Sequence, residues 1–253
     1  MLLVADIGNS TSGFGLYDQH DLIRQWRITT ASRTADEYEL VLEGLLAGDA
    51  PAITGAAMAS VVPAVTEVLR ATLERISPTE VVVVGPGVRT GLNVSVDNPR
   101  EVGADRIANA VGAIDRYGAP VVTVDFGTAT TVDLVGGSGA YLGGAIAPGP
   151  RIGGDALVEA TSALRRVELA VPRHAVGKST VEAIQSGLLF GTAGAVDTLV
   201  DRFRAEHSVS DDSPVVATGG MSRLISPLCR TITDVDDDLT LWGLKVIHAR
   251  NSI

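Results

Sequence analysis

Short apolar runs separated by turn residues open the chain and predict strands. The first three, Leu2 to Ala5, Gly13 to Tyr17 and Leu22 to Ile28, follow one another closely, as the strands of a sheet do. Two further runs, Gly55 to Val62 and Val81 to Val84, consist of β-branched or small apolar residues and suit strands that are buried on both faces. The N-terminal part of the chain therefore predicts five strands.

A period near 3.6 residues predicts helices between and after these strands. The stretch Thr34 to Leu46 begins with a Thr-x-x-Glu sequence, which is the pattern of a helix-capping box. Val65 to Ile76 has helical spacing, and so does Ala104 to Tyr117. The segment Gly85 to Pro99 between them is rich in Gly, Pro and Asn and predicts a loop.

The same order of elements then begins again. The pattern predicts strands and helices over these segments: strands at Val121 to Val124, Thr131 to Val135, Tyr141 to Ala145 and Val215 to Ala217, and helices at Gly154 to Leu164, Thr180 to Glu206 and from Ser222.

An internal repeat explains this second beginning. The first strand of each half ends in a similar hexapeptide, Asp6-Ile7-Gly8-Asn9-Ser10-Thr11 and Asp125-Phe126-Gly127-Thr128-Ala129-Thr130. Such self-similarity indicates a duplicated unit. We expect an α/β protein of two similar halves around a central cleft, residues 1–115 and 116–253.

Each position of the repeated hexapeptide suits the binding of a phosphate. The Asp offers a carboxylate to a hydrated divalent cation, the Gly lets backbone N–H groups approach phosphate oxygens, and the hydroxyl and amide side chains donate hydrogen bonds. Taken singly, each copy is also typical of a tight hairpin turn. A third glycine turn, Gly219-Gly220, follows the strand Val215 to Ala217 and suits a flat ligand such as adenosine.

Composition and charge narrow the classes of partner. The chain has 253 residues, is 45% hydrophobic and carries a formal net charge of −10, so it can build a large core but presents no basic cluster for nucleic acid. A polyanion such as ATP would need its own metal ion. The apolar runs are interrupted before the roughly 18 residues of a membrane span, and Met1 leads into a strand without a charged leader. With the single cysteine Cys229, we expect a soluble, cytoplasmic protein.

Three other patterns resemble functional motifs but do not support a binding or catalytic site. The stretch Val176-Gly177-Lys178-Ser179 imitates a P-loop, but the first glycine of that motif would fall on Pro172. The acidic run Asp236 to Asp238 favours an exposed turn before a helix at Leu239 to Arg250 over a metal cluster. The four histidines are dispersed, and Cys229 has no recognisable base, so we assign neither to a site.

The chain resembles the type III pantothenate kinases, within the superfamily of actin, the sugar kinases and Hsp70. The two hexapeptides and Ala217 to Gly220 are similar to the phosphate and adenosine motifs of that superfamily. Three segments resemble signatures of the family itself: Asn98 to Arg106, Gly143 to Gly149 and Val176 to Thr180.

The resemblance implies roles for individual residues. Asp105 matches the catalytic base. The resemblance assigns two further groups of residues, for ATP and its phosphates Asp6, Ile7, Gly8, Asn9, Ser10, Thr11, Ser12, Gly13, Gly127, Thr128, Gly219 and Gly220, and for pantothenate Gly103, Ala104, Asp105, Arg106 and Thr180. The guanidinium of Arg106 suits a carboxylate, although an Arg on a helix is more often a surface ion pair. Without the resemblance, Asp105 would read as a favourable first-turn carboxylate.

The resemblance also implies cofactors, a partner and a reaction. Mg²⁺ is expected near Asp6 through water, a monovalent cation, K⁺ or NH₄⁺, at Asp125, and a homodimer whose second subunit completes the substrate pocket. The implied activity is ATP-dependent phosphorylation of pantothenate, the first step of coenzyme A synthesis. Two alternatives stay open: a kinase of another small metabolite, and a catalytically silent nucleotide-binding paralogue with a regulatory or accessory role. The chain departs from the commonest family pattern at Val96 and over Pro150 to Asp155.

Overall fold

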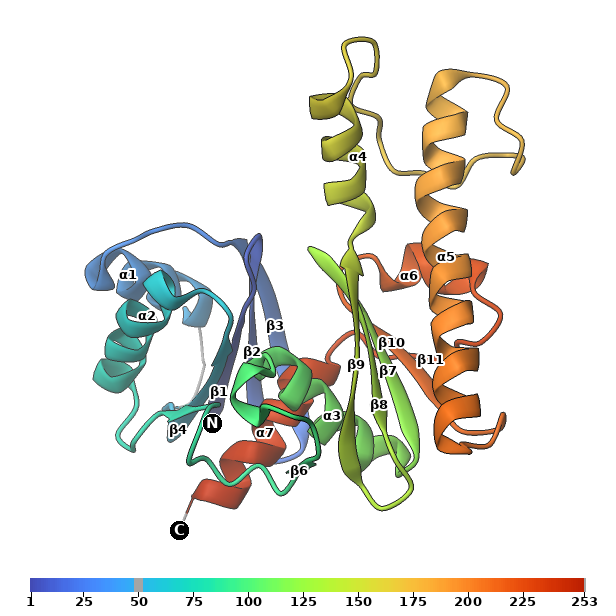
Figure 1. Ribbon diagram of the computed structural model, residues 1–253. Helices are drawn as coiled ribbons and strands as arrows, with labels where there is room; N and C mark the ends of the chain where they lie inside the picture. The colour runs from blue at the N-terminus through green and yellow to red at the C-terminus, as the bar shows by residue number, and fades with distance from the viewer. Residues whose placement is uncertain (48–51, 253) are drawn as a thin grey trace. The chain divides into compact units, whose positions relative to one another are not determined.

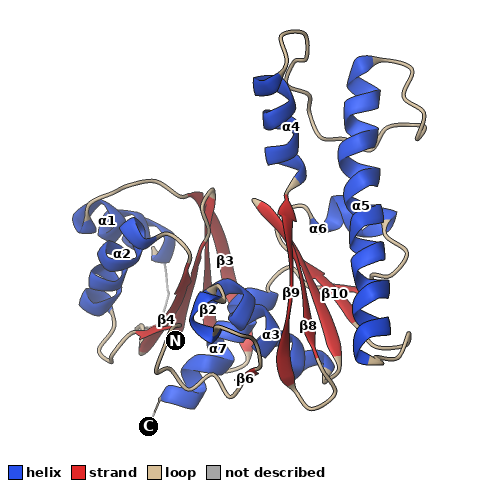
Figure 2. Cartoon of the chain, in the orientation of Figure 1, coloured by secondary structure: helices blue, strands red, loops and turns tan. Residues whose placement is uncertain are grey.

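The computed structural model describes residues 1–47 and 52–252, and its chain forms two compact units. Unit 1 consists of Met1–Leu92, Asp97–Arg116 and Asp238–Ile253, and unit 2 of Asn93–Val96 and Tyr117–Asp237. Each unit has its own sheet with helices packed on it (Figure 1, Figure 2). The last segment of the chain, which the sequence placed in the C-terminal half, packs in unit 1.

Unit 1 contains a five-stranded mixed sheet. Its strands are β1 (Leu2–Ile7), β2 (Thr11–Asp18), β3 (Asp21–Thr29), β4 (Gly55–Ser60) and β5 (Val82–Val83), in the spatial order β3-β2-β1-β4-β5. Strand β1 is antiparallel to β2 and parallel to β4. All five strands that the hydrophobic pattern predicts are therefore confirmed.

Two helices cover one face of this sheet, α1 (Ala35–Leu46) and α2 (Pro63–Ile76). Alternate residues of β1 point at them, because side chains two apart in a strand share a face, and together they form a buried core: Leu3, Ala5, Ile7, Tyr38, Leu42, Leu69 and Leu73.

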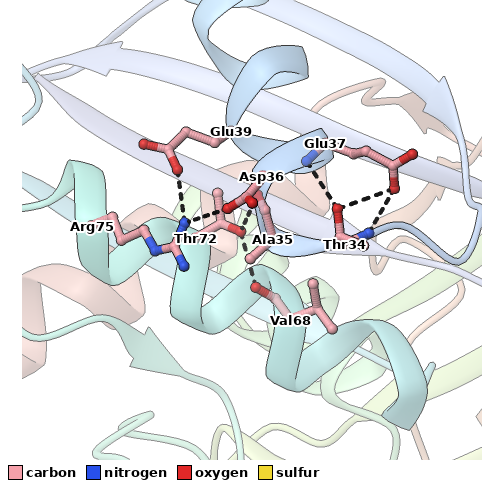
Figure 3. A network of polar contacts seen from close by, with 8 residues as sticks. All are labelled: Thr34, Ala35, Asp36, Glu37, Glu39, Val68, Thr72 and Arg75. Atoms are coloured by element: carbon pink, nitrogen blue, oxygen red, sulfur yellow. Dashed lines mark hydrogen bonds and ion pairs between the residues drawn. The ribbon is translucent and has the colours of Figure 1, made fainter.

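The capping box at the start of α1 is confirmed (Figure 3). The Thr34 hydroxyl accepts from the Glu37 backbone N–H at 3.3 Å, and the Glu37 carboxylate accepts from the Thr34 backbone N–H at 2.8 Å. Arg75 of α2 bridges Asp36 and Glu39 of α1, with both N–O distances at 2.9 Å. Local capping and one bridging guanidinium thus join the two helices.

The opposite face of the sheet is covered by the C-terminal helix α7 (Leu239–Asn251), which packs on β1, β2 and β4. Helix α3 (Ala104–Tyr117) lies against α7 (Figure 1). The backbones of these two helices touch at Gly112 and Gly243, where a Cβ at Gly112 would lie 2.6 Å from the carbonyl oxygen of Leu239. Only glycine allows this approach.

Unit 2 repeats the connectivity of unit 1. Its strands are β6 (Asn93–Val94), β7 (Val121–Phe126), β8 (Ala129–Val135), β9 (Ala140–Pro148), β10 (Val215–Thr218) and β11 (Asp234–Val235). Their order is β11-β10-β7-β8-β9-β6, with β7 antiparallel to β8 and parallel to β10. Strands β7 to β11 occupy the places in unit 2 that β1 to β5 occupy in unit 1, so the predicted duplication is confirmed. Strand β6 lies in a segment predicted to be a loop, and it pairs only with β9.

The helices of unit 2 are α4 (Pro150–Ala160), α5 (Thr180–His207) and the short α6 (Ser222–Ile225). Helix α5 packs on the sheet, and α4 continues from β9 beside it (Figure 1). The predicted start of α4 at Gly154 is wrong by one turn. The helix begins at Pro150 because proline suits the first helical position, and its N-cap Gly149 lies against the backbone of Thr128, leaving no room for a Cβ.

Helix α5 is long and apolar enough to span a membrane by length and composition, although the sequence predicted no such stretch. Among residues 1–47 and 52–252 it is the one helix that meets the test by length and composition, and core helices of soluble proteins meet it as well. Its residues Leu189, Ala193, Val196 and Val200 are buried against the sheet of unit 2. Of the apolar window that meets the test, 28% is buried.

The acidic run before α7 is not an exposed turn, and that expectation is wrong. Asp236 is only 6% exposed and accepts a hydrogen bond from the Tyr117 hydroxyl at 3.1 Å. Asp238 accepts two hydrogen bonds from Arg116, both at 3.0 Å. Both aspartates accept hydrogen bonds from residues more than a hundred positions away in the chain, which no local pattern reveals.

Candidate active site

The first phosphate-type loop is built at the carboxyl end of β1 in unit 1. Asp6 lies opposite Gly13 of β2 and Ala59 of β4, and the chain turns back with the Gly8 N–H donating to the Thr11 carbonyl at 3.1 Å. Asn9, Ser10 and Thr11 are exposed at the tip. The tip of the loop therefore carries an amide and two hydroxyl side chains on the surface of unit 1.

The hydroxyls of buried Ser12 and half-buried Thr30 hold this loop in shape. Thr30 donates to the Gly8 carbonyl at 2.7 Å, and it also pairs with the Ser12 hydroxyl at 2.8 Å. The side chains of Ile7 and Ser12 are fully buried, so any phosphate contact at these two positions involves the backbone. Thr30 supports the loop from the end of β3, and sequence reasoning missed it because it lies about 20 residues away from the motif.

The second loop follows β7 in unit 2, and the glycine turn after β10 lies directly beside it. Because β7 and β10 are parallel neighbours with Thr218 opposite Asp125, their carboxyl ends meet at one edge of the sheet. Gly219 has φ +92°, and a Cβ there would overlap the Asp125 carboxylate and lie 2.7 Å from the backbone of Phe126. The structure therefore brings Asp125, Gly127 and Gly219 together, as the repeat and the third glycine motif require.

Gly149, the N-cap of α4, also packs directly against the second loop. Its N–H donates to the Thr128 carbonyl at 3.1 Å, and a Cβ at this position would lie 2.6 Å from the Gly127 carbonyl oxygen. The sequence drew attention to Gly149 only as part of a family signature. Because it has no Cβ, Gly149 allows the start of α4 to contact the backbone of the loop.

Asp105 lies in the first turn of α3, after a short 3₁₀-helix at Pro99–Glu101. Asn98 begins that 3₁₀-helix by accepting from the Arg100 N–H at 3.3 Å. The Asp105 carboxylate accepts from the Arg106 backbone N–H at 2.8 Å. Burial raises the pKa of Asp105 above its ordinary value, and the Arg106 backbone bond and the charge of Arg106 oppose that rise. The carboxyl group is thus a better proton acceptor than an exposed aspartate.

Gly103 and Val61 set the surroundings of this carboxylate. A Cβ at Gly103 would overlap the Asp105 carboxylate and lie 3.7 Å from the side chain of Val61. The Val61 N–H in turn donates to the Ile7 carbonyl at 3.0 Å. Within unit 1, the Gly103 to Arg106 segment is therefore one side chain away from the end of β1. Val61 carries no motif, and only the fold reveals its place.

Thr180 lies elsewhere, at the exposed N-terminus of α5 in unit 2. The preceding Gly177-Lys178-Ser179 stretch forms a helix start and not a phosphate loop: the Ser179 hydroxyl accepts from the Glu182 N–H at 3.2 Å, and the Glu182 carboxylate accepts from the Lys178 N–H at 2.9 Å.

Neither strand-end aspartate belongs to a ready-made metal cage. Within the described ranges, no three His, Cys, Asp or Glu side chains gather in a way that could hold a metal ion. A divalent ion at Asp6, or a monovalent ion at Asp125, would therefore take most of its ligands from phosphate oxygens, backbone and water. Hard cations accept such oxygen ligands, and Mg²⁺ keeps several waters when it binds a nucleotide. The single carboxylates fit that chemistry.

Comparison with known proteins identifies the family. The family model for type III pantothenate kinase matches residues 2–202. The chain belongs to the type III pantothenate kinase family. Two relatives with that name are 51% identical in Nocardia farcinica and 46% identical in Salinispora arenicola, each alignment covering 99% of this chain and 98% and 100% of the relative.

Solved structures with the same fold include proteins of several functions. A polyphosphate/ATP-glucomannokinase from Arthrobacter sp. strain KM matches with a TM-score of 0.54 and 16% identity, covering 99% of both chains. A protein described as a Baf family transcriptional activator from Campylobacter jejuni matches with a TM-score of 0.61 and 19% identity, covering 98% of both chains. These likenesses show the fold alone, which is the predicted actin-like and sugar-kinase fold.

Proposed function

We propose that this type III pantothenate kinase family member transfers the γ-phosphoryl group of ATP to the 4′-hydroxyl of pantothenate, giving 4′-phosphopantothenate and ADP. The observation that carries the proposal is the pair of matching strand-end loops, with a carboxylate of raised pKa beside the first of them. Relatives of the same name match over nearly the whole chain.

In the proposed reaction, Asp105 orients the acceptor hydroxyl. The hydroxyl oxygen forms a bond to the γ-phosphorus while the bond to the β,γ-bridging oxygen breaks, and the hydroxyl proton passes to the Asp105 carboxylate. A loose phosphoryl-transfer transition state depends mainly on orientation and electrostatic stabilisation. Burial that raises the pKa of Asp105 makes the late proton transfer easier. Arg106 is proposed to bind the pantothenate carboxylate through its planar guanidinium.

Each of the two loops is proposed to offer hydrogen-bond donors to phosphate oxygens. Asn9, Ser10 and Thr11 of unit 1 supply exposed polar groups, while the positive φ of Gly219 lets the backbone approach the nucleotide. Mg²⁺ near Asp6 and K⁺ or NH₄⁺ near Asp125 would supply charge neutralisation for the triphosphate. In unit 2, Thr128 is proposed to contact ATP.

We also propose that the protein is a cytoplasmic homodimer formed through the helices of unit 2. Ile152 and Leu157 of α4 and Val181 of α5 are 42%, 39% and 49% exposed. Two hollows lined mainly by apolar residues, of about 220 and 420 Å³, lie along α4 and α5. A second copy would cover this apolar surface, and it would bring a partner surface to the exposed Thr180.

A coupled assay of ADP release tests the activity. Wild-type protein is given ATP and Mg²⁺ with pantothenate, first in potassium and then in sodium buffer, and the product is identified by mass spectrometry. The proposal expects 4′-phosphopantothenate, with faster turnover in potassium. Absence of turnover with pantothenate, together with turnover on a sugar or short hydroxy acid, would reject the substrate assignment. Light scattering before and after Leu157→Asp tests the dimer, which the substitution should weaken.

A further inference from the structure

Helix α3 carries Asp105 in its first turn, while its later turns are held by a helix from the far end of the chain. The Thr240 hydroxyl of α7 donates to the Asn109 side-chain oxygen at 2.6 Å. Asn109 and Thr240 are 1% and 8% exposed. Asn109 follows Asp105 by four residues, so the two lie on the same side of α3, one turn apart. A buried hydrogen bond therefore anchors the turn next to the proposed catalytic carboxylate.

The same two helices are in backbone contact, which leaves them little freedom to slide. A Cβ at Gly243 would overlap the carbonyl oxygen of Ala108, and a Cβ at Gly112 would lie 3.1 Å or less from backbone atoms of α7. Contacts between backbones are stiffer than contacts between flexible side chains, because no rotamer change can absorb a displacement. Asp105 is only three residues before Ala108.

Helix α7 also packs on the strand that leads to the first phosphate loop. It contacts β1, β2 and β4, and the side chain of Leu241 lies 3.2 Å from the position that a Cβ of Gly15 would take. One face of α7 therefore touches the sheet that carries Asp6, and another face touches the helix that carries Asp105.

We propose that Thr240 and Gly243 are positioning residues that hold Asp105 in place relative to the Asp6 loop, through Asn109 and the glycine crossing of α3 and α7. This inference rests on the proposed roles of Asp6 and Asp105 and adds residues that no motif marks. Full phosphoryl-transfer activity would then depend on two residues of the C-terminal helix α7. A displacement of the order of 1 Å in such a position costs about 10²-fold in rate.

The first experiment removes the hydroxyl and then restores it. Thr240→Val keeps the shape but leaves Asn109 without this donor, whereas Thr240→Ser retains the hydroxyl. We expect Thr240→Val to lower kcat about tenfold or more with the KM for ATP within about twofold of wild type, and Thr240→Ser to stay within about twofold in both. A loss of thermal stability with kcat per folded enzyme unchanged would indicate a purely structural role and overturn the proposal.

The second experiment separates the helices. Gly243→Ala forces α7 away from Ala108, and we expect it to lower kcat by about 10²-fold. Gly44→Ala is the matched control, because Gly44 lies in helix α1 with no other atoms near its Cβ position, and it should keep wild-type turnover. If Gly243→Ala does not fold, Thr240→Val carries the decision.

A third measurement reports on the position of Asp105 without turnover. The titration of its carboxyl group, followed by NMR, should shift in Thr240→Val but not in Thr240→Ser, because moving α3 changes the burial of this group. If wild type and Gly44→Ala show no turnover with pantothenate, the proposed function fails and this titration still decides the inference. A wild-type titration together with wild-type kcat in Thr240→Val would overturn it.

Discussion

Replacing Asp105 by asparagine separates a catalytic role from a helix-terminal one. Asp105→Asn keeps the shape of the side chain but removes its charge and its ability to accept the hydroxyl proton. Removal of a positioned general base lowers turnover by roughly 10²- to 10⁴-fold, which corresponds to about 2.7–5.4 kcal/mol of activation free energy. If Asp105 only stabilised the start of α3, turnover would hardly change.

The effect on folding stability should be small, because two contributions oppose each other. Loss of a carboxylate from the first turn of a helix costs about 0.3–1 kcal/mol. Burial, however, raises the pKa of Asp105, so its ionised form is itself unfavourable in the folded protein, and a neutral amide relieves that. We expect a net change below about 1 kcal/mol, or a shift in Tm of about 4 °C at most for a chain of this size.

The assay has a closely matched control in unit 1. Asp36 is the second residue of α1, as Asp105 is of α3, and its side chain is 85% exposed. Both substitutions to asparagine are compared by ADP release and by thermal unfolding. Asp36→Asn should leave turnover unchanged. The reasoning is refuted if Asp105→Asn keeps turnover within about threefold of wild type, or if it loses several times more stability than Asp36→Asn.

Further predictions concern folding, pH and reactivity. Gly219→Ala should weaken ATP binding measured by calorimetry and destabilise unit 2 by about 1–3 kcal/mol because of its positive φ, while Gly194→Ala, in open space on α5, should not destabilise it. The folded protein holds the Asp105 proton more tightly than the unfolded chain does. The free energy of unfolding of the wild type, relative to that of Asp105→Asn, should therefore fall as the pH rises from 3.8 through the raised pKa, and then stay constant. A relative free energy of unfolding that increased over this pH range would contradict the reasoning. Burial and the nearby Asp197 charge raise the pKa of Cys229 to about 12, so iodoacetamide at pH 8 should alkylate it about a thousandfold more slowly in the native protein than in urea. Thr34→Ala should cost about 1 kcal/mol in chemical unfolding by breaking the capping box, and an unchanged midpoint would contradict that role.

Local patterns predicted the elements that depend on near neighbours. The five strands of unit 1, strands β7 to β10 of unit 2, the start of α1 at its capping box and the full extent of α3 were recovered from periodicity and capping residues, whereas β6 and β11 were missed. The repeated Asp-x-Gly sequence further predicted two similar units, which the common strand order bears out. Each strand, cap and helix depends on residues within about ten positions of one another, the range over which side-chain period and cap chemistry act, and each copy of the repeat is itself a short contiguous segment.

Local patterns gave the wrong start for α4 and wrongly predicted that the acidic run Asp236 to Asp238 is an exposed turn. Helix α4 begins at Pro150 because Gly149 lies against Thr128, a contact that periodicity does not contain. Asp236 is buried because the hydroxyl of Tyr117 reaches it from 119 residues away. Charged residues favour exposure unless a partner is present, and the sequence does not say which partner the fold supplies.

The sequence alone was enough to indicate the family, the two phosphate-type loops and the candidate catalytic carboxylate, because each is written in contiguous residues whose chemistry is local. Tertiary structure alone decided that Gly219 lies against Asp125, that Val61 links Gly103 to the end of β1, and that α7 joins unit 1. Such contacts arise from the packing of elements far apart in the chain, where close backbone approach and burial select the partner.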